Sequence, residues 1–264
     1  EKAEKGEVLF GTVDSYLIYR FSGHKIHVSD VSNASRTLLM NIDTCAWDPK
    51  LCEIWNIPMA MLPKIVDHSE VIGRCDASIF GHEVPIITSI ANQQAALLGQ
   101  SGIHVGDVKN TYGSGCFLLM NTGSKHIDSK NGLVSTVAWK RNGQTTYALE
   151  GSVYSAGMNF QWLKDGLKVI DALEEVESIS KSVENDSGVV FIPAFVGLAA
   201  PYWRQDLKAA LFGITRGTSL AHIIRASVES LAFQSMDVLK AMEQDTHLKI
   251  KRLFVDGDFS TYDF

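Results

Sequence analysis

Three amide side chains, Asn92, Gln93 and Gln94, stand together in the stretch SIANQQAALLGQ. The residues before them, EVPIITSIA, are rich in β-branched side chains, and AALL follows them. This change in composition predicts a buried strand over 83–91 and a helix over 93–98. α/β enzymes commonly place reacting or ligand-binding side chains at such strand-to-helix turns. Amides bind and orient ligands but cannot accept a proton, so the corner is either catalytic or the remnant of a catalytic corner.

A glycine-rich turn is the second stretch that could carry chemistry. NTYGSGCF places Gly113, Ser114 and Gly115 between two expected strands. Glycines let the backbone approach a phosphate closely, and a serine hydroxyl can donate a hydrogen bond to its oxygens. The same residues also suit an ordinary hairpin turn, and the GxxxxGK[ST] phosphate-binding pattern is absent from the sequence.

Two further glycine corners lie nearer the C-terminus. EGSVYSAGMNFQWL places Gly157 at the start of an expected amphipathic helix, with Gln161 about one turn later. Such a helix start can accept a phosphate or a nucleotide, although simple helix packing explains the glycine equally well. VDGDFSTYDF places Gly257 and Asp258 after an expected strand, which is a common ligand-binding corner of α/β folds and also a common turn.

Composition limits the class of protein. The 264 residues carry a net charge of −6, with 45% hydrophobic and 20% charged residues, as in soluble globular proteins. The negative charge argues against a nucleic-acid or membrane-surface partner, and no apolar run is long enough to cross a bilayer. The four cysteines and eight histidines show no metal-ligand spacing, so we expect no metal site built from them. Few unpatterned cysteines also suit the cytoplasm.

The elements that must position these residues are strands and helices mixed along the whole chain, which predicts an α/β protein. Alternating residues on both sides of Asn142-Gly143 predict a hairpin, and Ser219 is the expected cap of a long helix. A change in composition near 100–106 predicts a domain boundary. Because the chain starts with Glu and both ends look like interrupted elements, we expect it to be part of a longer protein.

Several stretches together resemble a known family. They are FGTVDSYLIY, SNASRTLLMNI, NQQAALLGQ, KNTYGSGCFLLMNTG, FIPAF, APYW and HIIRASVESLAFQ. Their order and spacing are similar to those of glycerol kinases in the FGGY family of carbohydrate kinases. The resemblance covers essentially the whole chain and implies a two-domain actin-like ATPase (ribonuclease H-like) fold that is incomplete at both ends. Residues 1–99 would be the C-terminal part of the substrate-side domain, and residues 100–264 the N-terminal part of the nucleotide-side domain.

The resemblance also implies an activity. Glycerol kinases transfer the γ-phosphoryl group of ATP, bound with Mg²⁺, to glycerol and yield ADP and sn-glycerol 3-phosphate. Dimers and tetramers are common in the family, so a homo-oligomer is a further expectation. Two alternatives stay open: a catalytically degenerate relative that acts as a binding or regulatory protein, and another FGGY kinase that acts on a sugar or polyol. NTYGSGCF and SNASRT favour glycerol over the latter.

The implied acceptor site departs from the family at one position. Asn92 occupies the position of the Asp that serves as general base, while Gln93 and Phe117 match residues that contact glycerol. General base catalysis contributes ~10²–10⁴-fold to a rate. Phosphoryl transfer depends mainly on positioning and charge neutralisation, so the Asn predicts a slower reaction rather than none.

The implied nucleotide site departs at its last corner. The resemblance places nucleotide contacts at Ser114, Gly157, Gln161, Gly257 and Asp258, and it places Tyr262 where the family usually has Asn. Asp258 replaces the second glycine of a Gly-Gly pair beside the adenosine. A like charge at about 4 Å from a phosphate costs ~1 kcal/mol in water and ~4 kcal/mol at intermediate dielectric, so Asp258 predicts weaker nucleotide binding.

Overall fold

A computed structural model describes residues 1–185 and 188–263. The chain divides into two compact units. The first contains residues 1–99, 121–126 and 135–148. The second contains residues 100–120 and 127–134 together with the described residues from 149 onward. Both units mix helices and strands, which confirms the α/β class. The family domains expected at 1–99 and 100–264 stay a prediction, because two later segments cluster with the first unit.

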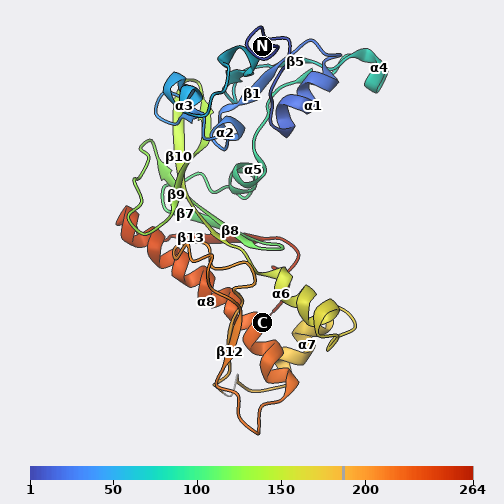
Figure 1. Ribbon diagram of the computed structural model, residues 1–264, viewed down its shortest axis with the longest axis vertical. Coiled ribbons are helices and arrows are strands. Elements are labelled where there is room, and N and C mark those ends of the chain that lie inside the picture. The colour runs from blue at the N-terminus through green and yellow to red at the C-terminus, as the bar shows by residue number, and fades with distance from the viewer. Residues whose placement is uncertain (186–187, 264) are drawn as a thin grey trace. The chain divides into compact units, whose positions relative to one another are not determined.

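The first unit is built from short elements (Figure 1). β1 pairs in parallel with β4, and β2–β3 and β5–β6 form antiparallel pairs. In chain order the elements are α1 (Val13–Phe21), β1 (Val28–Asp30), α2 (Val31–Ala34), β2 (Met40–Asn41), β3 (Ala46–Trp47), α3 (Pro49–Ile54), η1 (Met59–Met61), β4 (Lys64–Val66), β5 (Gly73–Arg74), α4 (Ala77–Phe80), β6 (Pro85–Ile86) and α5 (Asn92–Gly99).

The residues around Asp48 explain where α3 begins. Asp48 is the N-cap of α3, and its carboxylate accepts hydrogen bonds from the backbone N–H groups of Lys50 and Leu51. Pro49 follows at the first helical position, where a missing N–H costs no hydrogen bond. The expected helix over 93–98 is confirmed as α5.

The expected buried strand over 83–91 is wrong. Only β6 is a strand, and Ile87 is 63% exposed. The β-branched run favours an extended backbone, but β6 pairs only with the two-residue β5, so the ladder ends there. Tertiary contacts, rather than the local pattern, decide how the remaining residues up to α5 are held.

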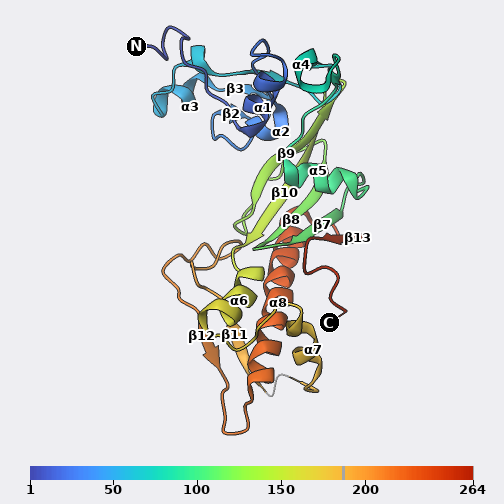
Figure 2. The same cartoon turned by 90° about the vertical axis from the view of Figure 1, so that its right-hand side faces the viewer.

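The second unit contains most of a five-stranded sheet in the order β13-β7-β8-β10-β9 (Figures 1 and 2). β13 pairs in parallel with β7, and β7 pairs antiparallel with β8. β8, β9 and β10 contribute residues to both units. The elements are β7 (Asp107–Tyr112), β8 (Cys116–Gly123), β9 (Val134–Arg141), β10 (Gln144–Val153), α6 (Gly157–Gln161), the π-turn η2 (Trp162–Gly166), α7 (Glu175–Lys181), β11 (Val190–Ile192), β12 (Ala210–Phe212), α8 (Leu220–Thr246) and β13 (Arg252–Asp256).

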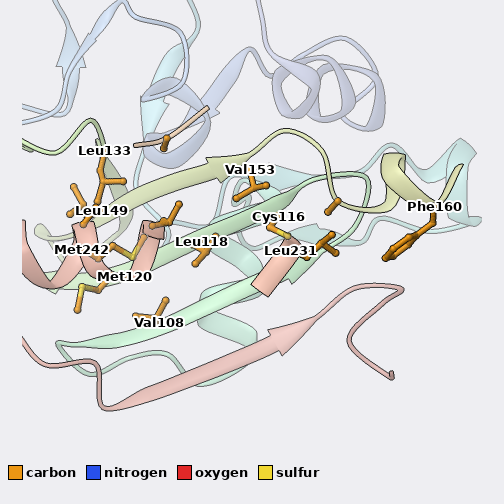
Figure 3. Packing of buried hydrophobic residues seen from close by; sticks show 14 of the residues in the cluster. Val108, Cys116, Leu118, Met120, Leu133, Leu149, Val153, Phe160, Leu231 and Met242 are labelled. Carbon is orange, nitrogen blue, oxygen red and sulfur yellow. The ribbon is translucent and has the colours of Figure 1, made fainter. Parts of the chain in front are cut away.

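The core of the second unit lies between this sheet and α8. β7, β8 and β10 contribute Val108, Leu118, Met120, Leu149 and Val153, and α8 contributes Leu231 and Met242 (Figure 3). Phe160 of α6 closes one end of this cluster. The apolar periodicity of α8 therefore places its buried stripe against the strands that carry the glycine corners.

Two turn predictions from the sequence are confirmed. Asn142 and Gly143 have φ of 50° and 74°, the left-handed conformation that a tight β9–β10 hairpin requires. Ser219 is the N-cap of α8, and its backbone N–H donates to Nδ1 of His222 at 3.0 Å. Within the described residues, none of the helices has both the length and the apolar character needed to span a membrane.

Candidate functional site

The three amides of the first corner do not share one environment. Asn92 is exposed at the first residue of α5, and its Oδ1 accepts a hydrogen bond from the backbone N–H of Gln93 at 2.9 Å. Gln94 is only 2% exposed, and its Nε2 donates to the carbonyl of Val137 at 3.3 Å. Gln94 is therefore a packed structural residue. Asn92 and the partly exposed Gln93 are the amides that can meet a ligand.

The chain leading into this corner is fastened by residues that sequence reasoning missed. Ser89 Oγ donates to the carboxylate of Asp30 at 3.0 Å, and the backbone N–H of Ala91 donates to Ser32 Oγ at 2.8 Å. Asp30 itself is the N-cap of α2. A capping pattern is visible in DVSNAS, but it gives no sign that the cap also reaches a segment 59 residues away.

The glycine-rich turn joins the start of α6 in the second unit. Gly113 N–H donates to the Gly115 carbonyl at 3.0 Å, which closes the β7–β8 turn and leaves Ser114 exposed at its tip. The carbonyl of Ser114 accepts the N–H of Ala156 at 2.9 Å, and the carbonyl of Gly113 accepts the N–H of Gly157 at 2.9 Å. The two separate corners of the sequence thus form one backbone cradle.

The third corner, after β13, reaches the same place. Gly257 has a φ of 93°, and a Cβ there would lie 2.9 Å from the backbone nitrogen of Tyr112. Phe259 N–H donates to the Tyr112 carbonyl at 3.4 Å. Glycine is required because the backbone turns left-handed directly against β7. Ser114, Gly157 and Gly257, which lie far apart in the sequence, therefore gather around one end of β7.

A cluster of aromatic side chains packs against this cradle at Gly157. A Cβ on Gly157 would lie 2.9 Å from Cζ of Phe259, so the Phe259 ring rests on the Gly157 backbone. Phe259 packs edge-on against Phe160 with centroids 5.0 Å apart, and against Tyr262 at 5.7 Å. Tyr262 Oη donates to the carbonyl of Leu173 at 3.0 Å. Aromatic rings also line an adjacent cavity of about 250 Å³.

The remaining predicted residues lie as follows. Gln161 is exposed, and its Nε2 donates to the carboxylate of Asp165 one turn along. Asp258 is exposed, with its carbonyl accepting from Thr261 Oγ1 at 3.5 Å. Phe117 lies on β8, partly buried, in the second unit. Because Asn92 and Gln93 belong to the first unit, a shared acceptor site with Phe117 stays a prediction.

β7, the strand that leads into the cradle, carries a buried lysine that sequence reasoning missed. Lys109 of β7 is 0% exposed, and its Nζ donates to Thr111 Oγ1 at 2.9 Å. Burial lowers its pKa from 10.5 to about 8, against the opposing effect of the carboxylates of Asp256 and Glu150. Asp256 is the last residue of β13, directly before Gly257. In the sequence, this buried lysine is indicated only by its position within the expected strand around residues 107–112.

The thiols provide no reactive centre. All four cysteines are free and buried. Burial raises the pKa of Cys116 to about 12, so this thiol stays protonated at neutral pH. Across the described ranges, no group of three or more His, Cys, Asp or Glu side chains is placed to hold a metal ion.

Comparisons with known proteins identify the family. Residues 1–99 match the N-terminal domain of the FGGY family of carbohydrate kinases, and residues 108–263 match its C-terminal domain. The chain belongs to this family, which confirms the family predicted from the sequence.

Individual relatives are similar over nearly the whole chain. Glycerol kinase 2 of Thermotoga maritima is 52% identical over 97% of this chain, and glycerol kinase of Pseudothermotoga lettingae is 51% identical over 100%. The crystal structure of Plasmodium falciparum glycerol kinase with ADP has a TM-score of 0.91 at 38% identity over 99% of this chain, which confirms the predicted fold. The chain spans about half the length of these relatives, 52% and 53% of the first two and 53% of the third.

Proposed function

We propose that the protein phosphorylates glycerol with ATP, yielding ADP and sn-glycerol 3-phosphate. The observation that carries this proposal is the identity of about half of all residues with relatives named glycerol kinase. Ser114, Gly157 and Gly257 lie together around one end of β7. This supports the proposal, because the family resemblance assigns nucleotide contacts to all three positions. The free, buried thiols support a cytoplasmic location, and a homo-oligomer stays a prediction.

The nucleotide would lie against the cradle of the second unit. ATP, bound with Mg²⁺, supplies the γ-phosphoryl group. The exposed Ser114 hydroxyl can donate to phosphate oxygens, and Gly157 offers a backbone without a side chain. The fit is incomplete because the Phe259 ring rests on Gly157 and has to turn away first. Mg²⁺ at nucleotide sites is usually held by the substrate phosphates together with one or two carboxylates.

The acceptor would lie against Asn92 and Gln93. Both amides can hydrogen-bond a glycerol hydroxyl and orient its oxygen for in-line attack. Asn92 cannot take the hydroxyl proton, so this chain contributes positioning and leaves general base catalysis unused. Because phosphoryl transfer has a loose transition state, positioning alone supports a slow reaction.

A second candidate is a degenerate family member that binds ligand or a partner without turnover. Two observations favour it: the amide at Asn92 and the aromatic ring on Gly157. Nothing in the site favours the third reading, a kinase for another sugar or polyol.

A coupled ATP/glycerol assay and glycerol calorimetry on the unaltered chain and on Asn92→Asp distinguish the two candidates. Glycerol kinase function predicts glycerol binding by both proteins and a rate increase of up to ~10²–10⁴-fold in the variant. Asn56→Asp is the matched control, because this exposed residue follows α3 and its left-handed φ of 53° tolerates Asp. Glycerol binding without turnover in either protein would support the degenerate reading, and no binding in either would refute both acceptor-site assignments.

A further inference from the structure

The segment that delivers Asn92 to the start of α5 has few backbone pairings of its own. β6 ends at Ile86, and no strand continues through residues 87–91. Hydrogen bonds to other parts of the unit hold it instead. Thr88 Oγ1 donates to the carbonyl of His68 at 3.4 Å, and two further bonds reach Asp30 and Ser32. Ser89 Oγ donates to Asp30 Oδ2 at 3.0 Å, and Ala91 N–H donates to Ser32 Oγ at 2.8 Å. These contacts lie three residues and one residue before Asn92.

Asp30 is the centre of this arrangement. Its side chain is fully buried at the end of β1. Oδ1 accepts from the backbone N–H groups of Ser32 at 2.8 Å and Asn33 at 3.1 Å, and also from Ser32 Oγ. Oδ2 accepts from Asn33 Nδ2 at 2.6 Å as well as from Ser89. One carboxylate therefore caps α2 and fastens the approach to α5.

A histidine fixes the carboxylate from another side. Nδ1 of His68 lies against the backbone of Lys140, 3.0 Å from its nitrogen and 3.2 Å from its carbonyl oxygen, which fixes the orientation of the ring. Nε2 of the same ring lies 3.2 Å from Asp30 Oδ1 and donates to it, because an ionised carboxylate oxygen can only accept. Burial raises the pKa of Asp30, but the hydrogen bonds from His68, Ser32 and Asn33 outweigh it and keep the pKa below its usual value. The carboxylate is therefore charged and fully engaged at neutral pH.

We propose that Asp30 is a positioning residue for the acceptor corner, acting through Ser89 and Ser32 to set where Asn92 and Gln93 meet a small polyol. Asp30 does not touch the substrate. The proposal deepens the acceptor site of the proposed function and rests on it for the identity of the ligand. The Asp30 carboxylate accepts six hydrogen bonds, which hold it in one position. Residues 87–91 are not part of a strand, so their position depends on such side-chain contacts.

The role as helix cap and the role as positioning residue are separable. Ser89→Ala removes the direct bond between the approach segment and Asp30, and it leaves the α2 cap, His68 and the Ala91–Ser32 bond in place. Ser89→Thr restores a hydroxyl and is the rescue variant. Ser78→Ala is the matched control, because Ser78 Oγ donates to Asp76 at 2.7 Å in the same unit, at the exposed α4 cap.

The experiment measures hydrogen–deuterium exchange of peptides covering residues 88–96, and glycerol affinity by calorimetry. Ser89→Ala loses a hydrogen bond to a charged group. We therefore expect the exchange of residues 88–96 to become about 10- to 100-fold faster, and the glycerol affinity to fall by a comparable factor. Ser89→Thr should recover both quantities, and Ser78→Ala should change neither. The global unfolding midpoints of Ser89→Ala and Ser78→Ala, measured in the same way, show how much of the faster exchange comes from global destabilisation.

The outcomes separate this proposal from the proposed function. Unchanged exchange at 88–96 in Ser89→Ala would overturn the positioning role, as would faster exchange with unaltered glycerol affinity. If the unaltered chain binds no glycerol, the acceptor assignment fails, and the exchange data alone still decide whether Asp30 holds the corner.

Discussion

Replacing Lys109 tests whether β7 carries a buried charge. The Lys109 side chain is fully buried, and burial lowers its pKa from 10.5 to about 8. Between those two values the unfolded chain holds a proton that the folded chain has lost. The free energy of unfolding contributed by this group therefore rises with pH across that window, and it is constant below about pH 8.

The magnitude follows from the shift. At 1.36 kcal/mol per pKa unit, the charged lysine costs about 3 kcal/mol at pH 7 relative to an unperturbed one. Between about pH 7 and about pH 9.5 the folded chain loses this proton, and the free energy of unfolding should rise by about 2 kcal/mol. Lys109→Met has no proton to lose, so its stability should lack this rise.

Urea unfolding of the unaltered chain and of Lys109→Met at several pH values measures the effect. Other groups that titrate in this range are common to both proteins and cancel in the difference. Lys240→Met is the control, since Lys240 is exposed on α8 and its removal should leave the pH dependence intact. Parallel stability curves for the unaltered chain and Lys109→Met would refute the buried-charge reasoning.

Three further substitutions test the second unit. Phe259→Ala removes the ring resting on Gly157 and should tighten binding of a fluorescent ATP analogue by about 2- to 10-fold, the worth of an aromatic contact; unchanged affinity would show that the ring does not compete. Gly257→Ala forces a side chain into a left-handed position against Tyr112 and should lower the free energy of unfolding by about 1–3 kcal/mol in urea. Leu118→Ala leaves a cavity between the sheet and α8 and should cost about 2–5 kcal/mol by the same method, whereas a loss under about 1 kcal/mol would contradict its place in the core.

Local features were predictable wherever the residues themselves dictate the backbone. Asn142-Gly143 marked the β9–β10 hairpin because few other pairs adopt two left-handed conformations in a row. Ser219 marked the start of α8, and the glycine turn between β7 and β8 was placed correctly. The order of several specific stretches, NTYGSGCF and HIIRASVESLAFQ among them, was sufficient to predict the family.

Burial and contact partners were not predictable in the same way. Residues 83–91 have the composition of a buried strand, but strand formation needs a neighbouring strand, and only the short β5 is available. Gln94 is indistinguishable from Gln93 in sequence, yet its place one residue further along α5 points its side chain inward to Val137. These differences arise from residues distant in the chain, which no local pattern reports.

The sequence by itself determined the family, the α/β class and the presence at position 92 of an amide, which cannot accept a proton. Each of these depends on the identity of residues and their order. Only the tertiary structure decided that Lys109 is fully buried, that Phe259 rests on Gly157 and that Asp30 holds the segment that leads to Asn92. The physical reason is that desolvation and hydrogen-bond partnership depend on what surrounds a group in space.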